Sequence, residues 1–150
     1  FYLKAIGTKT STELMALDVE CTTNSACNIP KYKVSAEEIS DFLRYVKNQT
    51  GRYPIFYGNQ SVVKKLSQHK DSDRLLKKSL LWYARFKKTV TDFPKGIWKS
   101  YTFWQFSSEI NCKPDTECLY RVPGTKYDMD INVYNGTIKE MKRDWANLGN

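Results

Sequence analysis

The sequence predicts an α/β fold, in which parallel strands alternate with helices in a doubly wound sheet or a barrel. Short apolar runs bounded by turn residues recur along the chain, as is typical of buried strands, and stretches with helical spacing of apolar residues follow several of them. The chain has 150 residues, of which 41% are hydrophobic, so it is long enough to bury a core. We therefore expect residues 1–150 to form one domain.

The first predicted elements lie before residue 52. Residues 1–7 resemble the end of a helix, and ELMALDVE (13–20) is a mostly apolar run that indicates a buried strand. The clearest helix is 35–51, because Ser35 and Glu38 form a capping box at its start. Its other signals are four apolar residues on one face and a final glycine: Ile39, Phe42, Leu43, Val46 and Gly51.

The later elements continue the alternation of apolar runs and helical patterns. Within SYTFWQFSS, residues 101, 103 and 105 alternate with 102, 104 and 106, as expected for a strand with two distinct faces. The predicted elements are a short aromatic strand (52–59), a short amphipathic helix (61–68), strands at 79–86, 100–108 and 126–136, and a closing helix (137–148).

The net charge of +8 favours an anionic partner: nucleic acid, anionic lipid or the anionic polymers of a bacterial wall. The densest basic clusters are VVKKLSQHK and RLLKKS. No apolar run approaches the roughly 20 residues of a membrane span. No signal peptide is visible, because Lys4 and Gly7 interrupt the first apolar stretch, and a start at Phe1 suggests a mature or trimmed form.

Four cysteines form two local pairs, Cys21 with Cys27 and Cys112 with Cys118, each with five intervening residues in polar segments. Two disulfides that close loops are the favoured interpretation, and they indicate an oxidising compartment. A zinc site is the alternative, but the usual spacing of two to four residues is not met. The single histidine, His69, lies in a charged stretch, so no Ser-His-Asp or Cys-His site is predicted.

Asp18 and Glu20 end the apolar run 13–20. Residues i and i+2 of a strand point to the same side, so both carboxylates would project together where the strand gives way to a loop. They could share a cleft there. The alternative is that they cap a helix or are solvated acids at the end of a strand.

Other polar and aromatic residues also lie at or near predicted strand ends. In parallel α/β folds these ends meet at one edge, where ligands bind. Aromatic rings offer flat apolar faces to sugars, and acids can transfer protons, so together they indicate a carbohydrate cleft. The residues are Tyr57, Trp82, Tyr83, Trp104, Gln105, Asp128 and Asp130.

Five motifs, in order from residue 14 to 137, resemble the family 25 glycoside hydrolases, the muramidases (lysozymes) of bacteria, their phages and some fungi. LMALDVE is similar to the family's Asp-x-Glu strand, and the last motif aligns Asp130, Asn132 and Tyr134 with the family pattern. The other matching stretches are YPIFYGN, LLWYARF, FWQFSS and the whole segment VPGTKYDMDINVYNGT.

The resemblance implies an irregular (β/α) barrel of eight strands, of which this chain would supply the C-terminal five. The family's opening GIDvS-x-x-QG motif is absent from residues 1–150. LMALDVE would then be the fourth strand, and five strands cannot close the barrel. We expect a partial record of a longer chain. A fragment, or a stable fold with an altered barrel, is the alternative.

The resemblance also implies roles for individual residues. Glu20 would be the general acid, Asp18 would stabilise the transition state or orient the substrate acetamido group, and Asp130 would be a further acid of the cleft. Asp128 has no clear family counterpart. Sugars would contact Tyr57, Trp82, Trp104, Gln105 and Asn132.

The implied reaction is hydrolysis of the β-1,4 bond between N-acetylmuramic acid and N-acetylglucosamine in peptidoglycan, without a metal or organic cofactor. A carboxylate nucleophile, an attacking water and the substrate's own acetamido oxygen all remain open. We expect a monomer that is secreted, periplasmic or delivered by a phage, and that binds the anionic wall but not nucleic acid. A catalytically inactive wall-binding module is the main alternative, and a basic nucleic-acid binder is the second.

Overall fold

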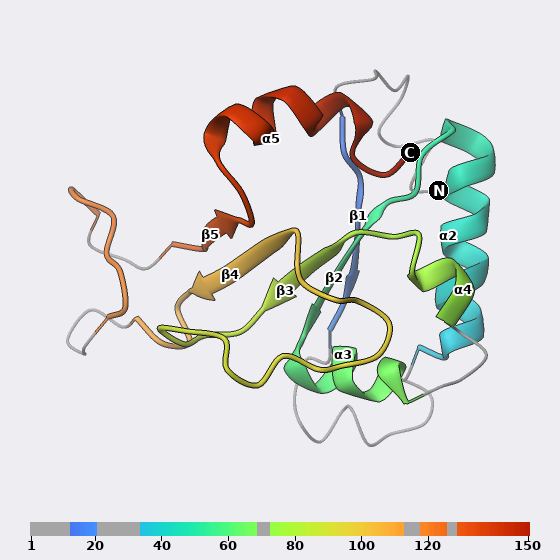
Figure 1. The fold of residues 1–150 in the computed structure, drawn as a ribbon. Helices are drawn as coiled ribbons and strands as arrows, with labels where there is room; N and C mark the ends of the chain where they lie inside the picture. The colour runs from blue at the N-terminus through green and yellow to red at the C-terminus, as the bar shows by residue number, and fades with distance from the viewer. Residues whose placement is uncertain (1–12, 21–33, 69–72, 113–117, 126–128) are drawn as a thin grey trace.

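In the computed structural model, residues 13–20, 34–68, 73–112, 118–125 and 129–150 are described. They form a sheet of five strands whose spatial order is the order along the chain (Figure 1). The helices lie around this sheet. The elements are β1 (Ala16–Val19), α2 (Ala36–Thr50), β2 (Ile55–Asn59), α3 (Gln60–Ser67), α4 (Asp73–Leu76), β3 (Leu81–Ala84), β4 (Phe103–Ser107), β5 (Ile131–Tyr134), α5 (Ile138–Asp144) and the 3-10 turn η3 (Trp145–Asn147).

The predicted α/β class is confirmed, and each strand and helix expected between residues 13 and 148 is present. The expected helix end at residues 1–7 lies outside the described residues. The short helix α4 was not predicted from the sequence. Among the described residues, no helix has the length and hydropathy that a membrane crossing requires.

The sheet is not parallel throughout. Strands β1 to β4 pair in parallel, whereas β5 pairs antiparallel with β4. A parallel neighbour requires a crossover that carries the chain back to the starting edge. After β4, the described part of the connection contains no helix, and the chain returns directly along its neighbour. The expectation of parallel strands is therefore wrong for the last strand.

Helix α2 forms the clearest part of the core. Its N-terminus has the predicted capping box, in which the Ser35 hydroxyl accepts from the Glu38 amide and the Glu38 carboxylate accepts from the Ser35 amide. Gly51 ends the helix in the left-handed conformation, with φ of 77°. The buried side of α2 packs on the sheet in one cluster that includes Ile39, Leu43, Phe56, Leu81 and Tyr83.

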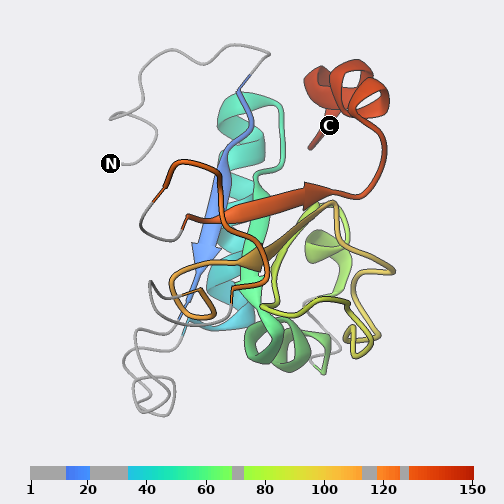
Figure 2. The same ribbon diagram turned by 90° about the vertical axis from the view of Figure 1, so that its left-hand side faces the viewer.

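The connection from β3 to β4, residues 85–102, contains no helix but still carries the chain to a parallel neighbour. It is held to the core by Ile97 and Trp98, both buried. The Trp98 ring stacks on Phe56 with centroids 5.4 Å apart, and its indole nitrogen donates to the Ser79 carbonyl at 2.8 Å. This irregular segment replaces a crossover helix and runs beside α3 in both views (Figures 1 and 2).

The strand register divides the side chains between two faces of the sheet. Asp18, Tyr57, Trp82 and Phe103 are successive partners across β1 to β4, so their side chains lie on the same face, which we call the site face. The opposite face carries Phe56 and Tyr83 and is covered by helices.

Candidate functional site

Three acids lie at strand ends near the site face. Asp18 is in β1, Glu20 follows that strand directly, and Asp130 directly precedes β5. All three residues are exposed to solvent, although protein atoms surround part of the Asp18 and Glu20 carboxyl groups. Glu20 interacts electrostatically with both of the others and also with Glu109, which follows β4. The fold therefore gathers carboxylates from widely separated parts of the chain, as the strand-end pattern predicted for Asp18, Glu20 and Asp130.

The pKa of Glu20 is raised. Partial burial is the largest cause, followed by the negative charge of Asp18, while the charges of Asp130 and Glu109 add to the rise. The pKa of Asp18 is also raised, by burial. Glu20 therefore stays protonated to a higher pH than an isolated glutamate does. This property suits a group that must donate a proton.

Tyr57 connects the acids to β4. Its hydroxyl donates to Gln105 Oε1 at 2.6 Å. Glu20 shares this single phenolic proton, and the shared hydrogen bond opposes the rise in the pKa of that acid. Burial and the charges of Glu20 and Asp18 raise the pKa of Tyr57 itself, so the phenol remains protonated. Gln105 is buried, which fixes the position of its amide.

We expect Tyr57→Phe to raise the pKa of Glu20 further, because the substitution keeps the ring but removes the hydrogen bond that favours the ionised carboxylate. The measurement is titration of the Glu20 side-chain carboxyl by carbon-detected NMR. Tyr53→Phe is the matched control, since Tyr53 precedes the same strand and contacts Lys47. A pKa that stays the same or falls in Tyr57→Phe would show that the hydroxyl does not stabilise ionised Glu20.

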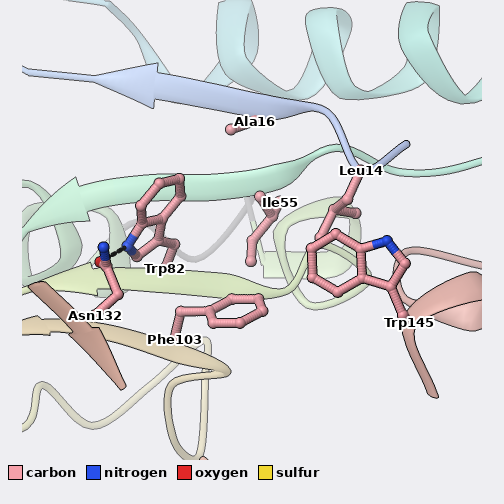
Figure 3. Close-up of a pocket in the computed structure, with 7 residues that line it drawn as sticks. All are labelled: Leu14, Ala16, Ile55, Trp82, Phe103, Asn132 and Trp145. Carbon is pink, nitrogen blue, oxygen red and sulfur yellow. Dashed lines mark hydrogen bonds between the residues drawn. The ribbon is translucent and has the colours of Figure 1, made fainter. Parts of the chain in front are cut away.

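Trp82 lies beside Tyr57, with ring centroids 5.1 Å apart, and its indole nitrogen donates to Asn132 Oδ1 at 2.7 Å. This bond joins β3 to β5 across the site face (Figure 3). The two side chains border a pocket of about 220 Å³ that is mainly apolar. Its lining residues are Leu14, Ala16, Ile55, Trp82, Phe103, Asn132 and Trp145.

Trp104 does not join this group. It pairs with Tyr83 and Val133, so it lies on the opposite face of the sheet from Trp82. Its indole nitrogen donates to the Arg85 carbonyl at 2.7 Å, and its ring packs near Tyr101. The expectation that Trp104 contacts the sugar together with Trp82 is corrected accordingly. Tyr83, another aromatic residue near a strand end, is buried in the core.

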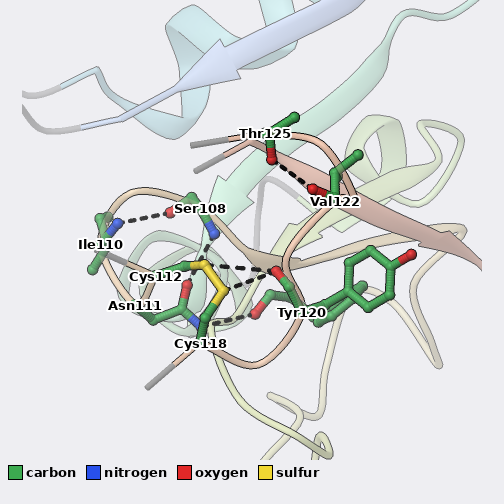
Figure 4. The surroundings of a disulfide bond; sticks show 9 residues. Ser108, Ile110, Asn111, Cys112, Cys118, Tyr120, Val122 and Thr125 are labelled. Carbon is green, nitrogen blue, oxygen red and sulfur yellow. Dashed lines mark hydrogen bonds between the residues drawn. A yellow bond between two sulfur atoms is a disulfide. The ribbon is translucent and has the colours of Figure 1, made fainter. Parts of the chain in front are cut away.

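Cys112 and Cys118 form a disulfide in the segment after β4 (Figure 4). Because both sulfur atoms are in this bond, the alternative of a zinc site is excluded for this pair. The loop is further braced by Asn111, whose side-chain oxygen accepts from the Ser108 amide and whose side-chain nitrogen donates to the Phe106 carbonyl. The bonds of Asn111 therefore stabilise the turn that carries Glu109, directly before the disulfide. The predicted Cys21–Cys27 pair, together with Asp128 and His69, lies outside the described residues.

Sequence reasoning missed two contributors to the site. Glu109 directly follows FWQFSS, so the same strand-end pattern that indicated Asp18 could have found it. Trp145 has no such signal, because it enters the pocket from the turn after α5 and contacts Phe103, 42 residues earlier, at a centroid distance of 6.3 Å. Within the described ranges, no group of three or more His, Cys, Asp or Glu side chains is arranged to hold a metal ion.

The arrangement combines a carboxyl group with a raised pKa, further carboxylates and an aromatic surface with amide groups. Such a site can donate a proton, stabilise a developing positive charge and hold a ring-shaped polar ligand against apolar faces. These are the requirements for cleaving a glycosidic bond.

Comparisons with known proteins agree in part with this chemistry. The family model described as "Glycosyl hydrolases family 25" matches residues 1–114. A search of curated proteins finds no match. Among solved structures, the chain is 28% identical to a muramidase from Acremonium alcalophilum (TM-score 0.60), covering 88% of this chain and 55% of the other.

Two further solved structures have similar folds. A muramidase from Trichobolus zukalii is 25% identical, with a TM-score of 0.60 and coverage of 87% of this chain and 54% of the other. A bacterial lysozyme from Streptomyces coelicolor is 23% identical, with a TM-score of 0.61 and coverage of 89% and 55%. The chain thus spans about 55% of the length of these structures. The family match covers most of the chain, and the chain belongs to glycosyl hydrolases family 25.

Proposed function

We propose that this chain is the catalytic part of a peptidoglycan hydrolase, an N-acetylmuramidase that cleaves the β-1,4 bond between N-acetylmuramic acid and N-acetylglucosamine. The observation that carries the proposal is the convergence of Glu20, Asp18 and Asp130 at one edge of the sheet, beside the rings of Tyr57 and Trp82. The raised pKa of Glu20 agrees with it. Family membership and the muramidases among the similar structures support it. Residues 1–150 would form one catalytic unit, the C-terminal part of a family barrel.

In this mechanism Glu20 is the general acid. It donates its proton to the glycosidic oxygen as the bond from that oxygen to C1 breaks, and the sugar carrying C1 develops positive charge. Asp18, when ionised, stabilises this charge or orients the acetamido group of the substrate. Asp130 is a further acid of the cleft. Water completes the hydrolysis at C1 and returns a proton to the site.

The sugar-binding residues are those that the site face brings together. Tyr57 and Trp82 present rings at neighbouring positions, and Asn132 presents an exposed amide. Gln105, at the paired position of β4, is buried and contributes as the hydrogen-bonding neighbour of Tyr57. The bonds from Tyr57 to Gln105 and from Trp82 to Asn132 hold these groups in place before substrate arrives. No cofactor is required by this chemistry.

The substrate places the enzyme outside the cell membrane, as a secreted, periplasmic or phage-delivered protein that acts as a monomer. The Cys112–Cys118 disulfide supports an oxidising location. A net charge of +8 supports attraction to an anionic wall, and this attraction should weaken as salt is added.

The test is digestion of purified peptidoglycan by the full chain, followed by borohydride reduction and mass spectrometry of the released sugars. A muramidase leaves a new reducing end on N-acetylmuramic acid, so the reduced product is muramicitol. A glucosaminitol end would indicate cleavage of the other glycosidic bond. Wall binding with no new reducing ends would replace the proposal by the inactive binding module.

A further inference from the structure

The positive charge of the chain is concentrated in one segment. Residues 60–99 contain eleven Lys or Arg and three Asp, so this stretch carries the whole net charge of +8. The remaining 110 residues contain equal numbers, thirteen basic and thirteen acidic. A general requirement for solubility would not place all the excess charge in about a quarter of the chain. Some of these residues lie elsewhere, such as Lys78 beside Tyr53, but one group lies together along α3 and the segment 85–102.

Two contacts hold the 85–102 segment alongside α3. Near the start of the helix, Gln60 Nε2 donates to the Asp92 carbonyl at 3.0 Å. At its end, Gly96 lies so close to Ser67 that an added Cβ would be 2.9 Å from the Ser67 Cβ. Residues 92–96 therefore follow the helix for most of its length, as Figures 1 and 2 show.

This arrangement brings lysines from both segments to one surface. Lys64 is four residues after Gln60 and three before Ser67, so it lies on the helix side that faces the segment. Lys88 and Lys95 belong to the segment, and both are exposed, as Lys64 is. We call the group Lys64, Lys88 and Lys95 the lysine face.

Asp92, the acid within this surface, is already neutralised. Its carboxylate pairs with Arg85 and, at 3.1 Å, with Lys87 Nζ, and these hydrogen bonds lower the pKa of Asp92 to about 2. Asp92 therefore remains ionised as the partner of Arg85 and Lys87 within the segment. The unpaired positive charge of this surface is left to the lysine face.

The lysine face borders the edge of the sheet that carries the acids. Helix α3 begins directly after β2, and the segment begins directly after β3, while Glu20 directly follows β1. Because these three strands are parallel, their carboxyl ends meet at the same edge. A polymer bound on the lysine face would thus lie next to the site that contains Glu20.

We propose that the lysine face binds a polyphosphodiester polymer of the bacterial wall, and so anchors the enzyme beside the glycan that it cleaves. This inference rests on the proposed function. Lysine ammonium groups are point charges that suit a flexible chain of phosphates. Each phosphate would contact a lysine in turn, and the binding would be strongly dependent on salt.

Two features favour this polymer over other polyanions. The large hydrophobic side chains that are exposed in the described structure lie outside residues 60–99, so the lysine face offers no apolar anchor for a lipid surface. In the same segment, Tyr83 and Trp98 are buried and Phe93 packs against the core, while Trp82 lies on the site face. Of the described rings, only Phe86, itself half-buried, lies near the lysine face, so no row of rings is available to stack on successive bases.

The test compares two charge reversals of equal size. Lys64→Glu/Lys95→Glu alters the lysine face, and Lys139→Glu/Lys142→Glu alters exposed positions on α5, at the other end of the molecule (Figure 1). Binding to fluorescent polyglycerol phosphate is measured by anisotropy at low salt. We expect the first variant to bind at least about 10-fold more weakly and the second to change little.

Equal losses in both variants, or tighter binding of the full chain to duplex DNA or to anionic vesicles at matched phosphate concentration, would overturn the proposal. Cleavage of a soluble phosphate-free peptidoglycan oligosaccharide is measured in parallel and should be the same in all three proteins. If no protein cleaves the oligosaccharide, the proposed function fails, while the binding data still decide the role of the lysine face.

Discussion

Replacing Glu20 by Gln is expected to reduce peptidoglycan hydrolysis by about 10²–10⁴-fold, the usual contribution of a positioned general acid. The amide has nearly the shape of the carboxyl group but cannot donate a proton to a leaving oxygen. Release of reducing ends from purified peptidoglycan measures the loss. Binding to the same material should persist, because Tyr57, Trp82 and the amides of the site face are retained.

The same substitution should not weaken the fold. Since the folded-state pKa of Glu20 is raised, its ionisation disfavours the folded state, and stability from this group is lost as pH rises through the folded pKa. Gln cannot ionise, so Glu20→Gln should be as stable as the parent, or slightly more so, at neutral pH. Thermal unfolding at pH 4 and pH 7 tests this. If Glu20 had a structural role instead, Glu20→Gln would have a lower melting temperature than the parent at pH 7.

Glu109→Gln is the matched control, since it removes the same charge from an exposed acid that acts on Glu20 only through its field. Its removal should lower the pKa of Glu20 and shift the alkaline limb of the pH profile to lower pH, because a general acid is active only while protonated. Activity at the optimum should stay within a few-fold of the parent. If both variants lose activity equally, Glu20 is not the proton donor.

Local signals in the sequence were sufficient for most of the elements. The capping boxes at Ser35 and Thr137 are formed by residues three positions apart, so their partners are visible within one turn. The apolar runs likewise predicted strands, because burial on a parallel sheet requires them. Such features depend on neighbours in the chain, and the structure agrees with them.

The site could be predicted only as far as strand ends determine it. The i, i+2 relation placed Asp18 and Glu20 together, but applying the strand-end rule to Trp104 ignored which face each position takes. Trp104 is one residue out of phase with Phe103, the partner of Trp82, so it points to the other side. The alternation in the sequence already separates Trp104 from Gln105, which is its neighbour in the strand. The register was needed to show that Phe103 and Gln105, and not Trp104, share the face of Trp82.

Contacts between distant segments were not predictable from local patterns. The antiparallel direction of β5 depends on how the chain returns after β4, and the approach of Trp145 to the pocket depends on where the last helix docks. This docking is controlled by an arginine with no distinctive sequence signal. Arg52 follows α2, and its guanidinium reaches backbone carbonyls near both ends of the described chain.

We expect Arg52→Ala to lower the free energy of unfolding by about 2–3 kcal/mol. Arg52 Nε donates to the Leu148 carbonyl at 3.0 Å, Nη1 donates to the Glu13 carbonyl at 2.8 Å, and Nη2 donates to the Trp145 carbonyl at 3.3 Å. Alanine removes these charge-assisted bonds, and water can only partly replace them because the group is half-buried. The melting temperature should fall by roughly 4–12 °C.

We call the hydrogen bonds from Arg52 to these carbonyl groups the clamp. Two variants distinguish the loss of the clamp from a general effect of lost positive charge. Arg44→Ala removes an exposed arginine of α2 that pairs with Asp41, and an exposed pair of this kind contributes less than about 1 kcal/mol. Arg52→Lys keeps the charge but not the planar fork, so it should be intermediate. Hydrogen exchange in residues 145–150 should accelerate in Arg52→Ala and not in Arg44→Ala, since the clamp holds the turn that carries Trp145 into the pocket. Equal stability losses in the two alanine variants would show that the carbonyl contacts do not hold the C-terminal segment in place.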